Sequence, residues 1–240
     1  INPKNNKVKI VSRFGVGYDS VDLDVLKKNK IILTNTPNAV RRPVAVASLT
    51  MILSLSGKLM IKDNLVREGR WNERTNHMGV GLINKTLGIV GFGGIGREFV
   101  KISKGLFKNI ICYDPFVGKE EMKNLQVDKV DFDEIANSSD FLVILCDLNE
   151  KTRGMIDSTF LNKMKSSSYL INLSRGPVVN EKHLITSLKQ NKISGAGLDV
   201  MTNEPIEENN ELLNLKNTIL TPHSLCWTDE CFDSIATEAI

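Results

Sequence analysis

Three glycines in the segment LGIVGFGGIGREF, residues 87–99, have a spacing that suits the binding of a phosphate group. Gly91 permits a tight turn, Gly93 lets the backbone approach a pyrophosphate, and Gly96 lets the following helix pack closely on its strand. The N-terminus of that helix adds N–H donors and the positive end of its dipole. The pattern predicts a phosphate cradle, and an ordinary strand-to-helix turn is the plain alternative.

An acidic residue at the end of the next expected strand strengthens this interpretation. Asp114 follows Gly91 at close to the spacing of about 20 residues that is typical of dinucleotide-binding units. Its carboxylate would accept hydrogen bonds from both hydroxyls of an adenosine ribose and would repel a 2′-phosphate, which favours NAD. The related loop of a methyltransferase that binds S-adenosylmethionine is the other alternative, but the glycines and the acid together favour a dinucleotide.

The elements that must position these residues alternate between strands and helices. Runs rich in Val, Ile and Leu alternate with amphipathic stretches between Lys85 and Pro222, a pattern typical of parallel strands joined by crossover helices. Helices are predicted after two capping residues, Asp157 and Asn180. The sequence therefore predicts an α/β fold with a doubly wound parallel sheet. Its expected strands are residues 86–90, 110–114, 141–146, 168–173, 195–200 and 218–221.

A shorter α/β fragment precedes this sheet, and a helix follows it. Strands are expected at residues 7–12 and 31–34 with a helix at 21–29 between them, and an apolar helix is expected to begin at Pro43. After Pro222, only a helical segment over residues 229–240 is predicted. The plan is one large sheet domain flanked by pieces of a second domain.

Composition limits the classes of partner. The chain has 240 residues, 41% of them hydrophobic, and its net charge of +3 marks neither a nucleic-acid binder nor a membrane binder. The four cysteines and three histidines show no metal-ligand spacing, so a reduced chain in the cytoplasm without a metal is expected. The longest apolar stretch, residues 44–57, is too short to cross a bilayer.

Three further motifs follow in order, and they carry a family resemblance: NLSRGPVVNE (172–181), GLDVMTNEP (197–205) and TPHSLCWT (221–228). With SRFGVGYDSVDL near the start and the glycine motif, they resemble the D-isomer-specific 2-hydroxyacid dehydrogenases over essentially the whole chain. The resemblance implies NAD-dependent interconversion of D-2-hydroxy acids and 2-keto acids. It also implies a Rossmann NAD-binding domain over residues 45–222. A partial, flavodoxin-like substrate domain would comprise 1–44 and 223–240, lacking its first strands and final helix.

The resemblance also assigns roles to three side chains. Arg175 matches the arginine that binds the substrate's carboxylate and keto oxygen. A guanidinium group is planar and permanently charged, so it can hold the 2-keto acid and polarise its carbonyl. His223 matches the histidine that exchanges a proton with the substrate oxygen, and Glu204 matches the acid beside it, which favours the imidazolium form. Taken singly, each residue would more often be structural or solvated.

Further positions follow from the same resemblance. The backbone amides of Val16 and Gly17 would receive the substrate carboxylate, and residues 36–38 should lie near the cleft between the domains. Asp199 would orient the carboxamide of the nicotinamide. The complete set expected to bind the cofactor is Gly91, Gly93, Gly94, Ile95, Gly96, Asp114, Ser174 and Asp199.

Two positions depart from the family pattern. Asp147 replaces the usual proline on the adenosine side of the cofactor site, where a carboxylate could weaken or redirect cofactor binding. Cys226 replaces a more usual glycine three residues after His223. An inert buried thiol is the preferred interpretation, and the alternatives are that it shifts the loop of His223 or makes the site sensitive to thiol reagents.

Several alternatives stay open at this stage. One of Arg13, Arg41 and Arg42 could bind a second anionic group on the substrate, although solvated arginines are the preferred interpretation. The protein could also be a phosphoglycerate dehydrogenase acting on 3-phosphohydroxypyruvate, because the segment RFGVG, residues 13–17, resembles the loop of that enzyme. It could instead be a non-catalytic, NADH-sensing protein like the family's corepressors. A homodimer is expected, formed through the helix from Pro43 and the segment to Leu82.

Overall fold

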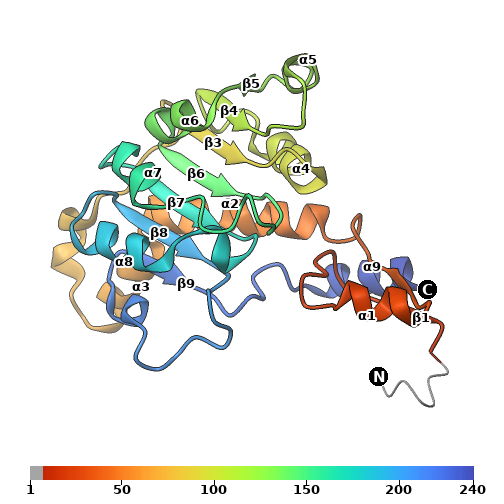
Figure 1. Ribbon diagram of the computed structural model, residues 1–240. Coiled ribbons are helices and arrows are strands. Elements are labelled where there is room, and N and C mark those ends of the chain that lie inside the picture. Colours follow the sequence, from red (N-terminus) through yellow and green to blue (C-terminus); the bar gives the residue numbers. More distant parts are fainter. Residues whose placement is uncertain (1–7) are drawn as a thin grey trace.

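The computed structural model describes residues 8–240 and contains two parallel sheets (Figure 1). The first position of the strand expected at 7–12 lies outside the described residues. The smaller sheet pairs β1 (Ile10–Ser12) with β2 (Ile32–Thr34). The larger sheet has the order β5-β4-β3-β6-β7-β8-β9. Its strands are β3 (Thr86–Val90), β4 (Asn109–Tyr113), β5 (Asp128–Lys129), β6 (Phe141–Ile144), β7 (Tyr169–Asn172), β8 (Gly195–Leu198) and β9 (Thr218–Leu220).

Helices cover both faces of the larger sheet, which confirms the predicted doubly wound α/β fold. The helices near the smaller sheet are α1 (Leu23–Lys28) and α9 (Asp229–Ala239). Those around the larger sheet are α2 (Arg41–Gly57), α3 (Leu59–Arg67), α4 (Gly94–Ser103), α5 (Lys119–Lys123), α6 (Phe132–Ser138), α7 (Ser158–Lys163) and α8 (Glu181–Lys189). Three short 3₁₀ helices of the described chain are η1 (Trp71–His77), η2 (Gly176–Val178) and η3 (Glu211–Asn214).

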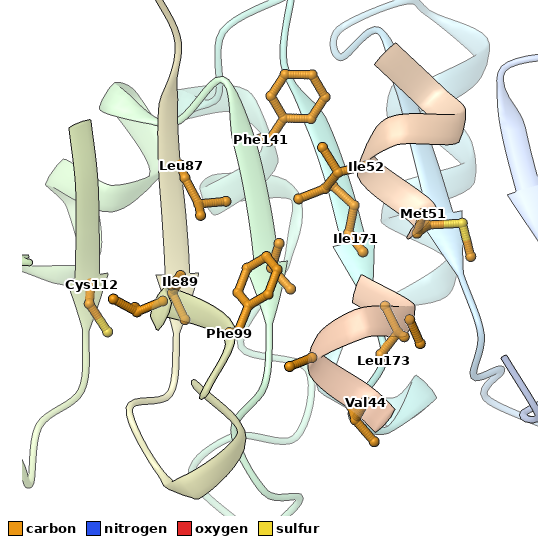
Figure 2. Close-up of a cluster of buried hydrophobic side chains, with 14 of the residues drawn as sticks. Val44, Met51, Ile52, Leu87, Ile89, Phe99, Cys112, Phe141, Ile171 and Leu173 are labelled. Atoms are coloured by element: carbon orange, nitrogen blue, oxygen red, sulfur yellow. The ribbon is translucent and has the colours of Figure 1, made fainter. Parts of the chain in front are cut away.

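Two apolar cores hold the helices on the sheet. On one face, Ile52 of α2 and Phe99 of α4 pack in a single cluster with Leu87 of β3 and Ile171 of β7 (Figure 2). On the other face, α6, α7 and α8 pack against the same strands. Full burial of one such side chain stabilises the fold by about 1.5–3 kcal/mol. This explains why β6 and β7 are apolar and buried along their whole length.

The long helix α2 begins earlier than predicted. It starts at Arg41, so the expected start at Pro43 is wrong, and Pro43 is its third residue. A proline is tolerated there because the N–H groups of the first helical turn have no intrahelical acceptor. Within residues 8–240, no single helix is long and apolar enough to cross a membrane. Only α2 and α3 taken together, bent by 58°, reach that length and composition.

The two ends of the described chain, residues 8–240, lie beside the smaller sheet, on the right of Figure 1. The hydroxyl of Ser12 donates to the carbonyl of Ala239 at 2.9 Å. The carboxylate of Glu238 accepts from the backbone N–H of Ala39 at 2.7 Å and from the side chain of Asn38. These contacts join α9 to the N-terminal elements, so one small lobe contains both ends of the described chain.

The glycine motif lies where the strand order of the larger sheet reverses. β3 has β4 on one side and β6 on the other, and ligands of doubly wound sheets bind at such a switch point. Gly91 has φ +102°, and a Cβ there would lie 2.6 Å from the backbone nitrogen of Cys146. A Cβ on Gly96 would lie 2.4 Å from the carbonyl oxygen of Gly91. Both glycines are therefore required for this close packing.

Candidate functional site

A cavity of about 850 Å³ lies between the small lobe and the carboxyl ends of the large sheet's strands. Its walls come from the loop after β1, the ends of β6, β7 and β8, and the loop that leads from β9 to α9. Segments far apart in the sequence therefore share one pocket. Seven of the predicted site residues line it: Val16, Gly17, Ile95, Ser174, Arg175, Asp199 and His223.

The remaining predicted residues lie outside this wall. Glu204 lies beside His223 but does not line the cavity. Asp114 and the four predicted glycines, Gly91, Gly93, Gly94 and Gly96, do not line it either. Within residues 36–38, expected near the cleft, no residue lines the cavity, whereas their neighbour Asn35 does. Thr36 is fully buried, and its hydroxyl accepts a hydrogen bond from the N–H of Gly15 at 3.0 Å, so it supports the cavity loop from behind.

Arg175 is held by the turn that follows β7. Asn172, buried at the end of β7, donates from its side-chain amide to the carbonyl of Arg175 at 2.9 Å and accepts from the N–H of Ser174 at 3.0 Å. The guanidinium in turn donates through Nη1 to the carbonyl of Ser174 at 2.7 Å. The turn and the side chain therefore fix each other, and sequence reasoning missed the part that Asn172 plays.

The guanidinium of Arg175 lies directly against the N-terminal loop. A Cβ on Gly17 would be only 1.5 Å from Nη2 of Arg175, so that position accepts no side chain in this arrangement. The oxygen of the Val16 peptide accepts from the side chain of Asn35 at 2.8 Å. Within the described residues, the N–H groups of Val16 and Gly17 donate to no protein acceptor. Two free N–H donors therefore lie beside a guanidinium, an arrangement suited to an anion.

Asp19 is a member of the site that sequence reasoning missed. Its carboxylate accepts a hydrogen bond from Nε of Arg175 at 2.9 Å. Partial burial acts to raise the pKa of Asp19, but the hydrogen bond and positive charge of Arg175 outweigh it and hold that pKa below its ordinary value. Asp19 stands two residues after Gly17 in the quoted motif, which is the signal that could have identified it.

His223 and Glu204 form a pair at the C-terminal wall. Nδ1 of His223 lies 2.7 Å from Oε2 of Glu204, and Oε1 of Glu204 accepts from the N–H of Met201 at 2.9 Å. An ionised carboxylate can only accept, so the proton of this contact belongs to Nδ1. Nε2 is then the ring nitrogen left for a ligand of the cavity, which His223 lines.

The loop that carries His223 is anchored by Asp199, which is only 3% exposed. One carboxylate oxygen accepts from the hydroxyl of Thr221 at 2.6 Å and from the N–H groups of Ser224 and Leu225, each at 3.2 Å. His223, between these partners, adopts a left-handed backbone with φ +53°. The expected contact of Asp199 with a nicotinamide stays a prediction. Its observed contacts assign it the positioning of the histidine loop.

The glycine loop fits the phosphates of a dinucleotide. Gly93 caps the N-terminus of α4 without any side-chain hydrogen bond, and no atom lies within 4 Å of the place of its missing Cβ. This leaves the first N–H groups of the helix, with Gly94 and Ile95, open to an anion. The carboxylate of Asp114 accepts from the N–H of Phe92 at 2.8 Å, which holds it beside the loop.

The two departures from the family pattern both line the cavity. Asp147 is exposed, and its carboxylate accepts from the side chain of Asn149 at 3.0 Å. Cys226 is half-buried rather than buried, and this burial raises the pKa of its thiol to about 11. Whether the thiol is inert or sensitive to thiol reagents stays a prediction. Within residues 8–240, no group of three or more His, Cys, Asp or Glu side chains could hold a metal ion.

Comparison with known proteins identifies one family. The family model described as D-isomer specific 2-hydroxyacid dehydrogenase, NAD binding domain, matches residues 49–224. The chain is similar to a D-3-phosphoglycerate dehydrogenase of Archaeoglobus fulgidus, with 36% identity over 223 residues, 93% of this chain and 42% of that protein. It is also similar to a glyoxylate reductase of Thermococcus litoralis, with 37% identity over 236 residues, 96% of this chain and 71% of that protein. The chain therefore spans less than half of the Archaeoglobus relative.

Solved structures agree with this family. The fold matches a D-lactate dehydrogenase from Aquifex aeolicus, solved in complex with NAD and lactic acid, with a TM-score of 0.88 and 29% identity. The match covers 96% of this chain and 73% of that one.

Replacing Asp199 tests its anchoring role. Asp199→Ala removes the acceptor of three hydrogen bonds and leaves two backbone N–H groups without a partner, so we expect a loss of about 1–3 kcal/mol in the free energy of unfolding. Amide hydrogen exchange across residues 221–225 should accelerate together with that loss. Asp199→Asn, which keeps one acceptor oxygen, is the matched control and should show a smaller change. Unaltered exchange in the alanine variant would contradict the anchoring role.

Proposed function

Because the chain belongs to the D-isomer-specific 2-hydroxyacid dehydrogenase family, and residues 49–224 match its NAD-binding domain, we propose that the protein is an NAD-dependent D-2-hydroxyacid dehydrogenase. It would transfer a hydride between NAD(H) and a D-2-hydroxy acid or the matching 2-keto acid, acting on the CH–OH group of the donor. The observation that carries this proposal is the cavity wall shared by Arg175 and His223, with Glu204 on the remaining ring nitrogen of the histidine.

Arg175 binds the substrate in this proposal. Asp19 and Ser174 accept from Nε and Nη1 of the guanidinium, and Nη2 lies against Gly17. A substrate carboxylate placed beside Nη2 would accept hydrogen bonds from Nη2 and from the free N–H groups of Val16 and Gly17. The keto oxygen beside it would then be polarised by the same positive charge.

His223 exchanges the proton. Glu204 holds the proton on Nδ1, so Nε2 of the imidazolium gives its proton to the oxygen of the substrate as reduction proceeds. Asp199 keeps the loop in place, and the contact with Glu204 keeps the ring of His223 in one orientation between turnovers. In the oxidation direction, the neutral ring takes the same proton back.

The cofactor site extends along the carboxyl edge of the sheet from the glycine loop to the cavity. A bound nicotinamide would supply or accept the hydride at the substrate carbon. The open N-terminus of α4 would bind the diphosphate. The carboxylate of Asp114 would accept hydrogen bonds from the ribose hydroxyls and would repel a 2′-phosphate. Ile95, Ser174 and Asp199, on the cavity wall, would meet the nicotinamide half.

The division into domains and the compartment are further parts of the proposal. Residues 1–44 and 223–240 would belong to the substrate domain, because β1, β2, α1 and α9 form the small lobe. Residues 45–222 would form the NAD-binding domain. All four cysteines are free thiols, which suits the reducing cytoplasm.

A homodimer fits the surface of the segment from α2 to the start of β3. This segment presents many exposed apolar side chains, and a patch of this kind is typical of a subunit interface. They are Val46, Leu53, Leu59, Met60, Val66, Trp71, Met78 and Ile83. We propose that a second copy of the chain covers them.

The position of Arg13 favours one narrower alternative, a substrate with a second anionic group. It lines the cavity, and its Nε donates to the carbonyl of Gly17 at 3.1 Å, whereas neither Arg41 nor Arg42 lines it. A second anionic group on the substrate, as in 3-phosphohydroxypyruvate, could therefore pair with Arg13. The protein would then be a phosphoglycerate dehydrogenase. A non-catalytic NADH sensor is the other alternative, and it would bind NADH without reducing any keto acid.

Turnover by the full-length protein tests the proposal and ranks the substrates. We expect oxidation of NADH with one or more of glyoxylate, pyruvate, hydroxypyruvate, 3-phosphohydroxypyruvate and 2-ketoglutarate. His223→Ala should lose at least about a hundredfold in kcat, because general acid catalysis contributes about 10²–10⁴-fold. His183→Ala is the control and should turn over normally.

Arg13→Ala should lower kcat/KM only for the doubly anionic substrates, 3-phosphohydroxypyruvate and 2-ketoglutarate, if the phosphoglycerate alternative holds. NADH binding without any turnover would favour the sensor.

Light scattering coupled to gel filtration tests the dimer. The double variant Trp71→Glu and Met78→Glu places charges in the apolar patch and should convert a dimer to a monomer at micromolar concentration. Phe116→Glu, which changes a side chain that is 85% exposed after β4, is the control and should leave the mass unchanged. A monomeric wild-type protein would contradict the proposed assembly.

A further inference from the structure

Arg41 lies against the helix N-terminus of the glycine motif. A Cβ on Gly94, the first residue of α4, would be 2.4 Å from Nε of Arg41 and 3.0 Å from both Cδ and Cζ. The side chain of Arg41 thus occupies the space that a residue other than glycine would take at that position. This contact exists because α2 and α4 pack in the same core on one face of the sheet.

This place is electrostatically unfavourable for a cation. The N-terminus of α4 carries the positive end of a helix dipole, and Arg41 is also the first residue of α2, whose first turn has no acidic residue. Within residues 8–240, Arg41 forms no hydrogen bond or ion pair with an acidic side chain. Its neighbour Arg42 does, with Nη1 2.8 Å from Oε1 of Glu98.

The nearby acid Glu238 is already engaged. Its carboxylate accepts from the N–H of Ala39 at 2.7 Å and from the side chain of Asn38 at 2.6 Å. The charge of Arg41 is one of the causes that lower the pKa of the Glu238 carboxyl, so Glu238 offsets part of that charge. Within residues 8–240, however, no carboxylate forms an ion pair with the guanidinium of Arg41, which lies next to the helix end whose N–H groups are open to an anion.

We propose that Arg41 is a cofactor-binding residue whose guanidinium pairs with the diphosphate of the dinucleotide at the N-terminus of α4. Gly94 makes this possible, because a side chain at that position would push Arg41 away. This inference rests on the proposed NAD-dependent function, and it places Arg41 at the cofactor, whereas the sequence alone favoured a solvated arginine and left a substrate contact as the alternative. A guanidinium and the helix N–H groups would share the two phosphates as donors.

Equilibrium titrations of the full-length protein by quenching of tryptophan fluorescence test this role without any turnover. Arg41→Ala should weaken the binding of NADH and of ADP-ribose about tenfold, because a charge-assisted contact to phosphate is lost. Adenosine, which has no phosphate, should bind both proteins equally. Arg41→Lys should fall between them. Arg42→Ala is the matched control and should change NADH affinity by less than about twofold, since its surface ion pair with Glu98 contributes little.

A double-variant cycle tests the link to Gly94. Gly94→Ala alone should weaken NADH binding, and it should add little in a protein that already carries Arg41→Ala, because both changes remove the same contact. Additive losses would show that Gly94 acts independently of Arg41 and would overturn that part of the proposal.

Thermal melting separates a binding role from a structural one. Without ligand, Arg41→Ala should melt close to the wild-type temperature, because the variant loses both the repulsion at two helix N-termini and the attraction to Glu238. With saturating NADH, it should gain less in melting temperature than the wild type. Unchanged NADH affinity in Arg41→Ala would overturn the inference while leaving the proposed function intact. A wild-type protein that binds no NADH would overturn the proposed function and the inference together.

Discussion

The site depends on the buried carboxylate of Asp199 at the end of β8. Its hydrogen bonds to Thr221, Ser224 and Leu225 fix the loop by which the chain leaves the large sheet for the small lobe. His223 stands in the middle of that loop with a left-handed backbone, which a loosely held loop would abandon. Without this anchor, the histidine would have no fixed place relative to Arg175, which comes from the end of β7.

Arg175 and His223 are each oriented by partners that leave at least one side-chain nitrogen free for a ligand. Asp19 and Ser174 hold two nitrogens of Arg175, and Glu204 holds one nitrogen of His223. These partners fix the orientation of each side chain before any ligand binds, so ordering the site costs little during catalysis. The fold supplies this arrangement by bringing both ends of the described chain to one lobe beside the carboxyl edge of the sheet.

Much of this organisation could be predicted from local sequence signals. The apolar runs located the strands from β3 to β9 apart from the short β5, and Asp157 and Asn180 do cap α7 and α8. These features depend on neighbours within a few residues. The start of α2 was misplaced, because Pro43 is as acceptable at the third helical position as at the first.

Other features depend on packing between distant segments, which a single sequence does not specify. The contact of Asp19 with Arg175 joins the small lobe to the end of β7, and the place of Arg41 over Gly94 follows from the packing of α2 beside α4. Asp199 was recognised by its motif, but the partners that its carboxylate holds became apparent only in three dimensions. The family resemblance predicted the site residues, and the structure showed that seven of them line one cavity and what positions them.

The central claim is that this cavity reduces a bound 2-keto acid directly at its keto carbon. The most direct measurement uses NADH with deuterium at both C4 positions and the best keto acid of the panel other than glyoxylate, because glycolate has no D or L form. Mass spectrometry and chiral analysis of the product follow. The account predicts a D-2-hydroxy acid that carries one deuterium on the carbon next to its carboxylate. A hydroxy acid without deuterium, a product of the L configuration, or an unchanged keto acid beside bound NADH would contradict it.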